Sequence, residues 1–436
     1  MKSAKISSAT SFNSEIVMSP DKSISHRAAI MAGLATGKTK IKNYLLSEDT
    51  LNTLKMLEML GVHIERHGAD LTVTGAGMSG LRAPDDVIYL GNSGTALRVS
   101  AGFLAAQDFI TVLTGDASLR RRPMKRIIKP LRQMGAHIIS NNDRPPLIIN
   151  GSKLRPITYK SRVASAQVKT SIMLAALYAD GETIIEEPAP SRDHTERLFR
   201  YLNIPFEKTG NRIQMHGIDS FSAKDIYIPG DISSAAFFIV YTILKKDSRI
   251  LIKNVNLNET RAGLLTVLDR MGIKYGIENQ RELNGEALGD IRTYYQTGFK
   301  GVNIGGADIP KLIDELPVIS VLMSFATGAS RVTGAHELRV KESDRIKSIA
   351  DMLRAFNVDI KEFDDGFEIQ PSVNDMRLNS DAVESYADHR IAMSSLIFSA
   401  VLNEPVSVRN AESINTSFKD FFSLLNKCGA IYEFEE

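Results

Sequence analysis

The segment Pro20–Arg27 places cations and hydroxyl groups at the expected start of a helix. Its sequence, Pro-Asp-Lys-Ser-Ile-Ser-His-Arg, leads into a stretch of small and apolar residues. Asp and Ser can cap the first helical turn, whose free N–H groups and positive dipole end favour an anion. Lys22 and Arg27 add positive charge at the same place. The segment therefore predicts a binding site for an anionic ligand.

Five later segments repeat this design along the chain. Equivalent positions lie between 68 residues apart (Ser165 to Ser233) and 81 residues apart (Ser233 to Asp314). A turn, a strand, an amphipathic helix and two further strands follow each start, so six βαβαββ units account for the chain. The six equivalent positions are Ser23, Ser93, Ser165, Ser233, Asp314 and Asp388.

The two helices of each unit differ in polarity. The first helix is apolar nearly all round, as in Ala235–Val240, whereas the second has a charged face. An all-apolar helix is buried and an amphipathic one lies outside it. We therefore expect two α/β domains, each with three units that bury three near-parallel helices within a shell of sheets. The polar helix starts would emerge at one end of each domain and together form a trap for anions.

The expected domains are residues 20–228 and residues 1–19 with 229–436, with hinges at 18–21 and 228–231. The sixth unit ends one strand short of the others, so we expect the N-terminal strand near Ser14–Met18 to complete it. The first strand of the first unit is expected from whatever precedes that unit. Gly or Asn ends the second helix of every unit, where a left-handed conformation is needed. These exits are Gly61, Gly135, Asn203, Gly272, Asn357 and Gly429.

Composition excludes several other classes of protein. The 436 residues are 43% hydrophobic and 24% charged with a net charge of +2, which is typical of an ordinary globular protein and gives no reason to expect nucleic acid or membrane as a partner. Cys428 is the single cysteine, so an intrachain disulfide is impossible and a reducing compartment is expected. The longest apolar stretch, Ala235–Leu244, is about half a membrane span. We expect a cytoplasmic protein.

Many cations and a few carboxylates gather at the expected helix starts and nearby loops. This mixture suits phosphate and carboxylate groups of substrates, together with acid–base chemistry. Any one of these residues alone would be interpreted as a cap or a solvated charge. The cations are Lys22, Arg27, Arg98, Arg122, Lys169, Arg192, Lys341, Arg345 and Arg390, and the polar and acidic residues are Ser23, Thr95, Ser165, Gln167, Asp314, Glu342 and His389.

Over its whole length the chain resembles the 5-enolpyruvylshikimate-3-phosphate synthases of the enolpyruvyl transferase family. The motifs that carry the resemblance begin at Pro20, Gly91, Ser165, Ser191, Glu337 and Asp388 (Pro-Asp-Lys-Ser-Ile-Ser-His-Arg, Gly-Asn-Ser-Gly-Thr-Ala-Leu-Arg, Ser-Ala-Gln-Val-Lys, Ser-Arg-Asp-His-Thr-Glu, Glu-Leu-Arg-Val-Lys-Glu-Ser-Asp-Arg and Asp-His-Arg-Ile-Ala-Met). The resemblance implies the two-domain inverted α/β barrel fold. It also implies transfer of the enolpyruvyl group of phosphoenolpyruvate to the 5-hydroxyl of shikimate 3-phosphate with release of phosphate, in the synthesis of aromatic amino acids.

The resemblance also implies roles for individual residues. We expect a monomer with these two small-molecule substrates and no cofactor or metal. Asp314, Glu342 and Lys22 are the expected catalytic residues. The residues implied for shikimate 3-phosphate are Lys22, Ser23, Arg27, Ser165, Gln167, Arg192, Asp314 and Lys341. Those implied for phosphoenolpyruvate are Lys22, Gly94, Arg122, Gln167, Arg345 and Arg390, and the herbicide glyphosate competes for this second site in the family.

The chain departs from one branch of that family at two places. Thr416 stands where that branch has a lysine near phosphoenolpyruvate, with Lys419 three positions on, and Ala166 replaces a serine. Both differences match the variant branch that carries Ser-Ala-Gln and Ser-Arg-Asp-His-Thr-Glu. The contacts of residues 416–419 are left open.

Four other interpretations of these residues fit the sequence less well. The related transferase acting on UDP-N-acetylglucosamine uses a loop cysteine, whereas Cys428 lies at a helix exit. A nucleic-acid site at Arg120–Arg126 lacks interleaved aromatic residues. His63 and His67 have metal-pair spacing for a helix but lie in an expected surface hairpin. A phosphosugar-binding module without catalysis would not need Asp314 and Glu342.

Overall fold

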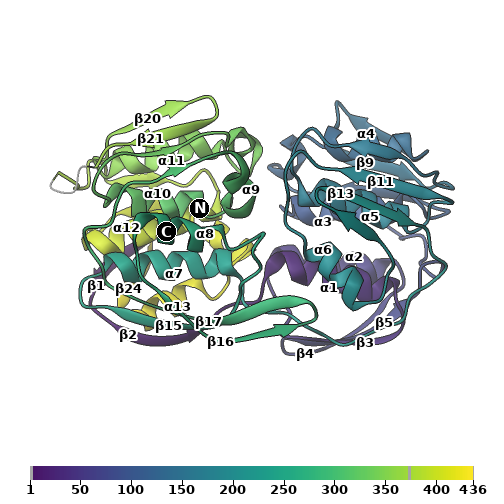
Figure 1. The fold of residues 1–436 in the computed structure, drawn as a ribbon, viewed down its shortest axis with the longest axis horizontal. Helices are drawn as coiled ribbons and strands as arrows, with labels where there is room; N and C mark the ends of the chain where they lie inside the picture. The colour runs from purple at the N-terminus through teal and green to yellow at the C-terminus, as the bar shows by residue number, and fades with distance from the viewer. Residues whose placement is uncertain (1–2, 372–374, 436) are drawn as a thin grey trace. The chain divides into compact units, whose positions relative to one another are not determined.

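The computed structural model describes residues 3–371 and 375–435. It is a mixed α/β structure that divides into two compact units (Figure 1). Unit 1 comprises Met1–Ser19, Pro229–Arg281 and Ala287–Glu436, and unit 2 comprises Pro20–Ile228 and Glu282–Glu286. Unit 2 thus contains, besides one continuous stretch, the tip of a hairpin from the later part of the chain.

Unit 2 holds three successive repeats. The first contains α1 (Lys22–Leu34), β3 (Thr36–Lys42), α2 (Glu48–Met59), β4 (His63–His67) and β5 (Asp70–Ala76). The second contains β6 (Ile88–Tyr89), α3 (Gly94–Leu104), β7 (Ile110–Thr114), the 3-10 turn η1 (Leu119–Arg121), α4 (Lys125–Gln133), β8 (His137–Asn141) and β9 (Arg144–Asn150). The third contains β10 (Thr158–Lys160), α5 (Ala166–Ala176), β11 (Glu182–Glu186), α6 (His194–Tyr201), β12 (Glu207–Thr209), β13 (Arg212–His216) and finally β14 (Ile226–Tyr227).

Unit 1 begins with β1 (Ser3–Ala9) and β2 (Asn13–Val17) and then holds the other three repeats. The fourth contains α7 (Ile232–Leu244), β15 (Arg249–Asn256), α8 (Gly263–Met271), β16 (Gly276–Leu283) and β17 (Glu286–Tyr294). The fifth contains β18 (Asn303–Ile304), η2 (Gly306–Asp308), α9 (Ile309–Leu312), α10 (Leu316–Ser324), β19 (Ser330–Val332), η3 (His336–Val340), α11 (Arg345–Ala355), β20 (Ile360–Phe363) and β21 (Gly366–Ile369). The sixth contains β22 (Ala382–Glu384), α12 (His389–Leu402), β23 (Ser407–Arg409), η4 (Ala411–Thr416), α13 (Phe421–Lys427) and β24 (Ala430–Glu435).

Within residues 3–371 and 375–435, six sheets of four strands match the six repeats. In each sheet a parallel edge strand lies beside the strand that follows the buried helix, and two antiparallel strands complete the sheet, as in the order β6-β7-β9-β8. The repeat pattern expected from the sequence is confirmed by this topology.

Two edge strands are exchanged between repeats. The strand that precedes α1 in the chain, β2, pairs in parallel with β15 of the fourth repeat (Ile16 opposite Ile252). The first repeat receives β14 instead (Ile226 opposite Ile41). The expectation that the first unit takes its first strand from the preceding chain is therefore wrong.

The strand that completes the sixth sheet is also not the one expected. Ser14–Met18 largely coincides with β2, whereas β1 lies between β23 and β24 in the sixth sheet. Buried Ala4 and Ile6 alternate with more exposed residues along β1, which is the period of a strand with one face in the core. The sequence pattern predicts one strand before Pro20, whereas the chain forms two there, β1 and β2.

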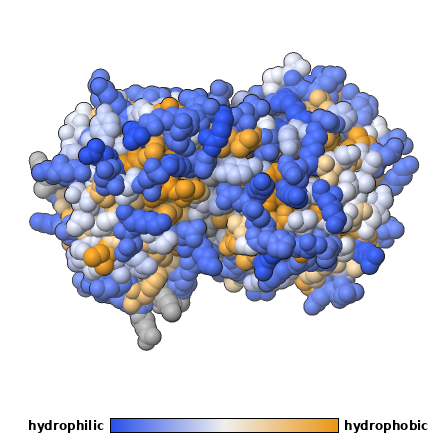
Figure 2. All heavy atoms as spheres, turned by 90° about the horizontal axis from the view of Figure 1, so that it is seen from below, coloured by the Kyte–Doolittle hydropathy of each residue, from blue (hydrophilic) through white to orange (hydrophobic). Residues whose placement is uncertain are grey.

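The apolar helices form the centre of each unit. In unit 1, α7, α10 and α12 contact one another, and in unit 2, α3 packs against both α1 and α5 (Figure 1). Their residues are almost all buried, whereas the second helices, such as α2 and α11, keep an exposed face. The face of the molecule in Figure 2 accordingly shows mainly hydrophilic side chains with scattered apolar ones. The expected division into inner and outer helices is confirmed.

All six helix exits adopt the left-handed conformation that the sequence predicted. This conformation lets the backbone leave the helix and enter the next strand. Cys428 is fully buried beside the last of these exits, as expected for a packing residue. The φ angles are 88° for Gly61, 103° for Gly135, 61° for Asn203, 78° for Gly272, 59° for Asn357 and 76° for Gly429.

Candidate active site

Side-chain hydrogen bonds tie the helix starts of unit 2 together. Gln167 of α5 donates to Thr95 Oγ1 of α3 at 2.8 Å and accepts from Arg98 Nη1 of α3 at 2.8 Å. His26 of α1 lies 3.4 Å from the Ser93 hydroxyl at the start of α3. The structure therefore brings the beginnings of α1, α3 and α5 to one place.

The caps of these helices leave backbone donors at the same place. Asp21 accepts the N–H of Ile24 at 2.9 Å, and Ser93 accepts the N–H of Ala96 at 3.1 Å. The other N–H groups of a first turn have no partner within the helix and carry the positive end of its dipole. The helix starts therefore add to the positive potential of the nearby cations.

Arg27 is buried in α1 and bonded to neutral oxygen atoms. Its Nε donates to Thr195 Oγ1 at 2.8 Å, its Nη2 to Thr170 Oγ1 at 3.0 Å and its Nη1 to the carbonyl oxygen of Ser23 at 3.0 Å. Burial lowers the pKa of Arg27 to about 10; the charges of Asp21 and Glu196 offset part of this, and the like charge of Arg192 adds to the lowering. This guanidinium is a buried positive charge suited to an anionic ligand.

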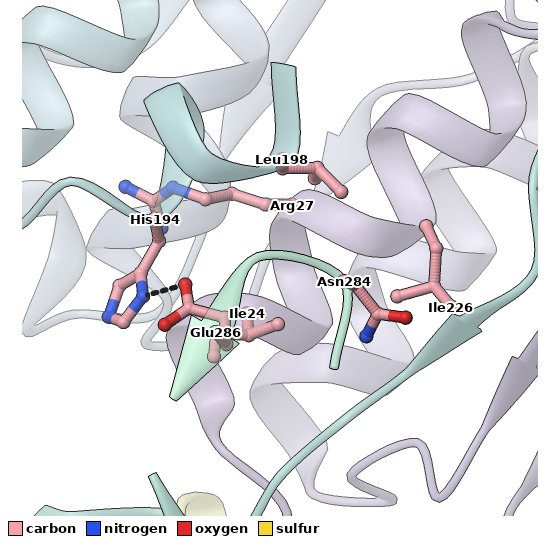
Figure 3. A pocket seen from close by; sticks show the side chains of 7 residues that line it. All are labelled: Ile24, Arg27, His194, Leu198, Ile226, Asn284 and Glu286. Carbon is pink, nitrogen blue, oxygen red and sulfur yellow. Dashed lines mark hydrogen bonds and ion pairs between the residues drawn. The ribbon is translucent and has the colours of Figure 1, made fainter. Parts of the chain in front are cut away.

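A small pocket lies beside Arg27 (Figure 3). Arg27 is its one lining residue that the sequence analysis singled out, and the others come from α1, α6, β14 and the hairpin tip. His194 Nδ1 lies 2.7 Å from Glu286 Oε1 in its wall. The lining residues are Ile24, Arg27, His194, Leu198, Ile226, Asn284 and Glu286.

Lys22 and Gly94 are the first residues of α1 and α3, and the Arg122 guanidinium lies beside Gly94. Lys22 Nζ is 3.1 Å from Asp49 Oδ2, with about a sixth of its side chain exposed. Arg122, just after η1, donates to Asn92 Oδ1. A Cβ on Gly94 would lie 3.2 Å from Nη1 of Arg122. Backbone and guanidinium therefore approach closely at the start of α3.

One expected cation of this region is not available to a ligand. Lys169 is 1% exposed and lies 2.8 Å from Glu187 and 2.8 Å from Glu196. Burial alone would lower its pKa, but these two carboxylates raise it above the usual lysine value. Since Lys169 follows Gln167 by two helical positions, it points to another side of α5. Ser23, Ser165 and Arg192 are partly exposed.

In unit 1 the candidate acids and cations form one cluster. Asp314, just before α10, lies 3.3 Å from Arg345 Nη1, 3.8 Å from Lys341 Nζ and 3.9 Å from Arg390 Nη2. Glu342 accepts from Arg345 Nη2 at 2.6 Å. The cluster comes from the starts of α10, α11 and α12 and the loop before α11. His389, buried at the start of α12, is next to Arg390.

Arg345 is the centre of this cluster. Its Nε donates to Asp388 Oδ2 at 2.8 Å, so it holds three carboxylates. Burial alone would lower its pKa, but Asp388, Glu342 and Asp314 raise it well above the ordinary arginine value. For Asp388 the effects are reversed: burial would raise the pKa of this carboxyl group, but the charge of Arg345 brings it below the ordinary value. Asp388 is therefore an ionised anchor for Arg345.

Sequence reasoning did not find the groups that hold these residues in place. Thr170 and Thr195 orient Arg27, Asp49 faces Lys22, and Asp388 was identified only as a helix start. No local motif signals such contacts, because each joins segments far apart in the chain. The exception is Asp388, whose position two residues before Arg390 is typical of a helix cap.

Residues 416–419 lie at the end of η4 and just after it. The Thr416 hydroxyl donates to the carbonyl oxygen of Ser413 at 2.7 Å, and Lys419 is exposed. His63 and His67 are exposed on β4, whose hairpin with β5 is the expected one. Within residues 3–371 and 375–435, no cluster of three or more His, Cys, Asp and Glu residues is placed to hold a metal ion.

No helix in the described part of the chain has the length and apolar character needed to span a membrane. Cys428 is a free and buried cysteine. Burial raises the pKa of its thiol to about 12, so the sulfur is protonated at neutral pH and is not a nucleophile.

Comparisons with known proteins match nearly the whole chain to one family. A family model described as EPSP synthase (3-phosphoshikimate 1-carboxyvinyltransferase) matches residues 6–425. The 3-phosphoshikimate 1-carboxyvinyltransferase of Thermodesulfovibrio yellowstonii is 45% identical over 96% of this chain and 98% of that protein. The one from Petrotoga mobilis is 43% identical over 96% of this chain and 98% of that protein.

Solved structures share the fold. The EPSP synthase from Acinetobacter baumannii superimposes with a TM-score of 0.87 at 38% identity, over 100% of both chains. The enolpyruvyl transferase NikO from Streptomyces tendae has a TM-score of 0.81 at 16% identity, over 100% of this chain and 99% of that one, a likeness of fold alone. The six-repeat inverted α/β fold expected from the sequence is thereby confirmed.

The fold is that of the enolpyruvyl transferases, and the clustered arginines and carboxylates fit a reaction between anionic substrates. With a family model that matches nearly the whole chain and relatives above 40% identity, the chain belongs to the EPSP synthase family. The reaction of this family transfers the enolpyruvyl group of phosphoenolpyruvate to shikimate 3-phosphate and releases phosphate.

Proposed function

We propose that unit 2 supplies most of the substrate-binding groups for this reaction, together with Lys22, and that unit 1 supplies the carboxylates Asp314 and Glu342 and further cations that bind substrate. The observation that carries the proposal is the environment of Asp314, a partly exposed carboxylate 3.3 Å from Arg345 and 3.8 Å from Lys341. These cations hold the carboxylate in place, and its partial exposure leaves it accessible to a substrate hydroxyl, as a general base requires. Glu342 supplies a second acid–base group beside the same arginine.

Shikimate 3-phosphate presents a phosphate and a carboxylate to the protein. Arg27 is a planar cation bonded to neutral oxygens, which suits recognition of an oxyanion. Lys22, Ser23 and Ser165 add a cation and hydroxyl groups at helix starts, where anions are favoured. The full proposed set is Lys22, Ser23, Arg27, Ser165, Gln167, Arg192, Asp314 and Lys341.

Phosphoenolpyruvate also carries a phosphate and a carboxylate, but it is smaller. Gly94 lets the ligand approach the backbone at the start of α3, and the Arg122 guanidinium lies beside that position. Arg345 and Arg390 contribute forked donors from unit 1 that hold a carboxylate in fixed geometry. The full proposed set is Lys22, Gly94, Arg122, Gln167, Arg345 and Arg390.

The chemistry is an addition followed by an elimination. In the addition, Asp314 takes the proton of the 5-hydroxyl, the oxygen bonds to C2 of phosphoenolpyruvate, and C3 accepts a proton from Glu342 or Lys22. In the elimination, C3 returns a proton to Glu342 or Lys22, the double bond forms again, and the bond from C2 to the phosphate oxygen breaks. Phosphate leaves, and Lys22 stabilises its charge.

A phosphate-release assay with both substrates tests the activity. We expect release that requires both shikimate 3-phosphate and phosphoenolpyruvate, and that falls to background when shikimate replaces its 3-phosphate. UDP-N-acetylglucosamine should not replace shikimate 3-phosphate, in keeping with the buried, protonated thiol of Cys428. Binding of shikimate 3-phosphate without any phosphate release would instead favour a binding module.

We extend the proposal to a closing motion. The cations assigned to shikimate 3-phosphate come from both domains, residues 20–228 and residues 1–19 with 229–436, and like charges repel until the anion binds. Hinges at 18–21 and 228–231 would allow the domains to close. Small-angle scattering should show a smaller radius of gyration with the ligand, and an unchanged radius would count against closure. We also propose that the protein is a cytoplasmic monomer. Light scattering after size-exclusion chromatography measures the molar mass and so tests the monomer.

A further inference from the structure

A buried arginine outside the expected site joins two helix starts of unit 1. Arg261, in the turn before α8, is 2% exposed. Its Nη2 donates to Asp231 Oδ1 at 2.9 Å and its Nη1 to Glu315 Oε1 at 3.0 Å. Both carboxylates are buried as well. This triad was not singled out from the sequence, because its members lie at three distant positions.

Both carboxylates of the triad occupy N-terminal caps. Asp231 caps α7 by accepting the N–H of Ser233 at 2.8 Å, and Glu315 is the residue immediately before α10. The hydroxyl of Ser233 also donates to Glu315. The start of α10 is therefore fixed to the start of α7 by one guanidinium and one hydroxyl.

The arginine itself is held rigidly. The backbone N–H of Arg261 donates to the carbonyl oxygen of Asn258 at 2.8 Å. Asn258 Oδ1 in turn accepts the N–H of Thr260 at 2.9 Å and its hydroxyl at 2.8 Å. The turn fixes the backbone of Arg261, and burial together with bonds to two carboxylates restricts its guanidinium, which therefore holds Glu315 in place.

Asp314 and Glu315 are neighbours with opposite surroundings. The carboxylate of Glu315 is buried against Arg261, whereas that of Asp314 is partly exposed and faces Arg345 and Lys341. We propose that Arg261 and Glu315 are positioning residues that set the orientation of the Asp314 carboxylate for the reaction. The inference rests on the proposed role of Asp314 as the base that takes the 5-hydroxyl proton.

The proposal predicts a loss of turnover without a loss of binding. Arg261→Lys keeps the positive charge but cannot bond both carboxylates in the same geometry. A misplacement of about 1 Å can lower a rate by about a hundredfold, so we expect kcat to fall between about tenfold and a hundredfold. KM for both substrates should change by less than about threefold. Glu315→Gln, which keeps the shape, should lose less turnover than Glu315→Ala.

A double-substitution cycle separates positioning from general stabilisation. Asp314→Asn removes the base, so adding Arg261→Lys to it should lower kcat by less than about twofold further. A purely structural role would lower kcat by the same factor in both backgrounds, which would overturn the proposal. The matched control is Arg270→Lys, an exposed α8 arginine paired with Asp308, which should leave kcat unchanged.

The same data distinguish this inference from the proposed role of Asp314. If Asp314→Asn keeps near-normal turnover, Asp314 is not the base, whatever Arg261→Lys does, and the inference falls with it. If Asp314→Asn loses turnover but Arg261→Lys does not, the base remains and the positioning role is wrong. Circular dichroism and urea unfolding show whether each variant folds. If Arg261→Lys does not fold, Glu315→Gln is used in its place.

Discussion

Arg27 in unit 2 and Arg345 in unit 1 are both buried guanidiniums, but their surroundings are opposite. Arg27 donates to two threonine hydroxyls and a carbonyl oxygen, and burial lowers its pKa to about 10. Arg345 is bonded to three carboxylates, which raise its pKa despite burial. The same side chain therefore has only neutral hydrogen-bond partners in one unit and is hydrogen-bonded to carboxylates in the other.

The difference indicates that the two arginines have different roles, one in substrate binding and the other in proton transfer. A buried cation with neutral partners gains most when an anionic ligand arrives, so Arg27 is suited to binding. A cation that organises three carboxylates holds acid–base groups in a defined arrangement, so Arg345 is suited to supporting proton transfer while still offering a fork to a substrate. The following predictions test whether the two units differ in this way.

The largest expected effect is on turnover. Asp314→Asn should lower kcat by about a hundredfold or more, because the carboxylate proposed to take the 5-hydroxyl proton is then lost. Steady-state phosphate release measures this. Near-normal turnover would remove Asp314 from the mechanism and weaken the view that unit 1 carries the chemistry.

A second prediction concerns the free energy of unfolding without ligand. Arg345→Met leaves buried Asp388 without its main partner, so the free energy of unfolding should fall by about 3 to 5 kcal/mol. Arg27→Met should change it by less than about 1 kcal/mol, because Thr170 and Thr195 can bond to each other at 2.6 Å. Urea unfolding compares them. Equal losses in the two variants would contradict the comparison.

A third prediction concerns the start of α3. A methyl group on Gly94 would lie 2.9 Å from Arg98 Nη1 and 3.2 Å from Arg122 Nη1, so both guanidiniums must shift. We expect the glyphosate inhibition constant of Gly94→Ala to rise by about tenfold, a difference of about 1.4 kcal/mol, and KM for phosphoenolpyruvate to rise less. Binding of shikimate 3-phosphate should stay nearly unchanged. Equal glyphosate inhibition constants would make Gly94 only a helix-start glycine.

The smallest effect is a pH dependence within unit 2. Burial, then the charges of Lys22 and Arg27, lower the pKa of His26 well below its usual value. The unfolded chain takes up this proton below about pH 6.5 and the folded chain does not, so stability is present above that pH and is lost as the pH falls. His26→Gln should reduce the slope of unfolding free energy against pH between about 5 and 6.5. His63→Gln, at an exposed histidine, is the control, and equal slopes in all three proteins would argue against a neutral His26.

Much of the fold could be predicted because its signals are local. Six helix starts and six Gly or Asn exits recur at similar spacing, and each depends on residues close together in the chain. The exchange of β2 and β14 could not be predicted in this way. It depends on which sheet an edge strand joins, and β2 precedes α1 in the chain yet pairs with β15.

The candidate site shows the same limit. Lys341 and Arg345 stand in one motif, so their proximity to each other could be expected, whereas the bond of Arg345 to Asp388 joins positions 43 residues apart. Lys169 illustrates the opposite error. Its motif is shared with Gln167, but the helical period turns it toward Glu187 and Glu196. The types and spacing of residues in the sequence identify candidate site residues. Their ion-pair partners are brought to them only by the fold.

Calorimetric titration with shikimate 3-phosphate tests most directly whether Arg27 serves binding and Asp314 serves the chemical step. The wild-type protein, Arg27→Met and Asp314→Asn should be titrated under the same conditions, without phosphoenolpyruvate. We predict that Arg27→Met weakens binding by about a hundredfold or more, because a buried charge-assisted contact is lost, and that Asp314→Asn changes the Kd by less than about tenfold. Loss of binding in Asp314→Asn with binding retained in Arg27→Met would contradict the account.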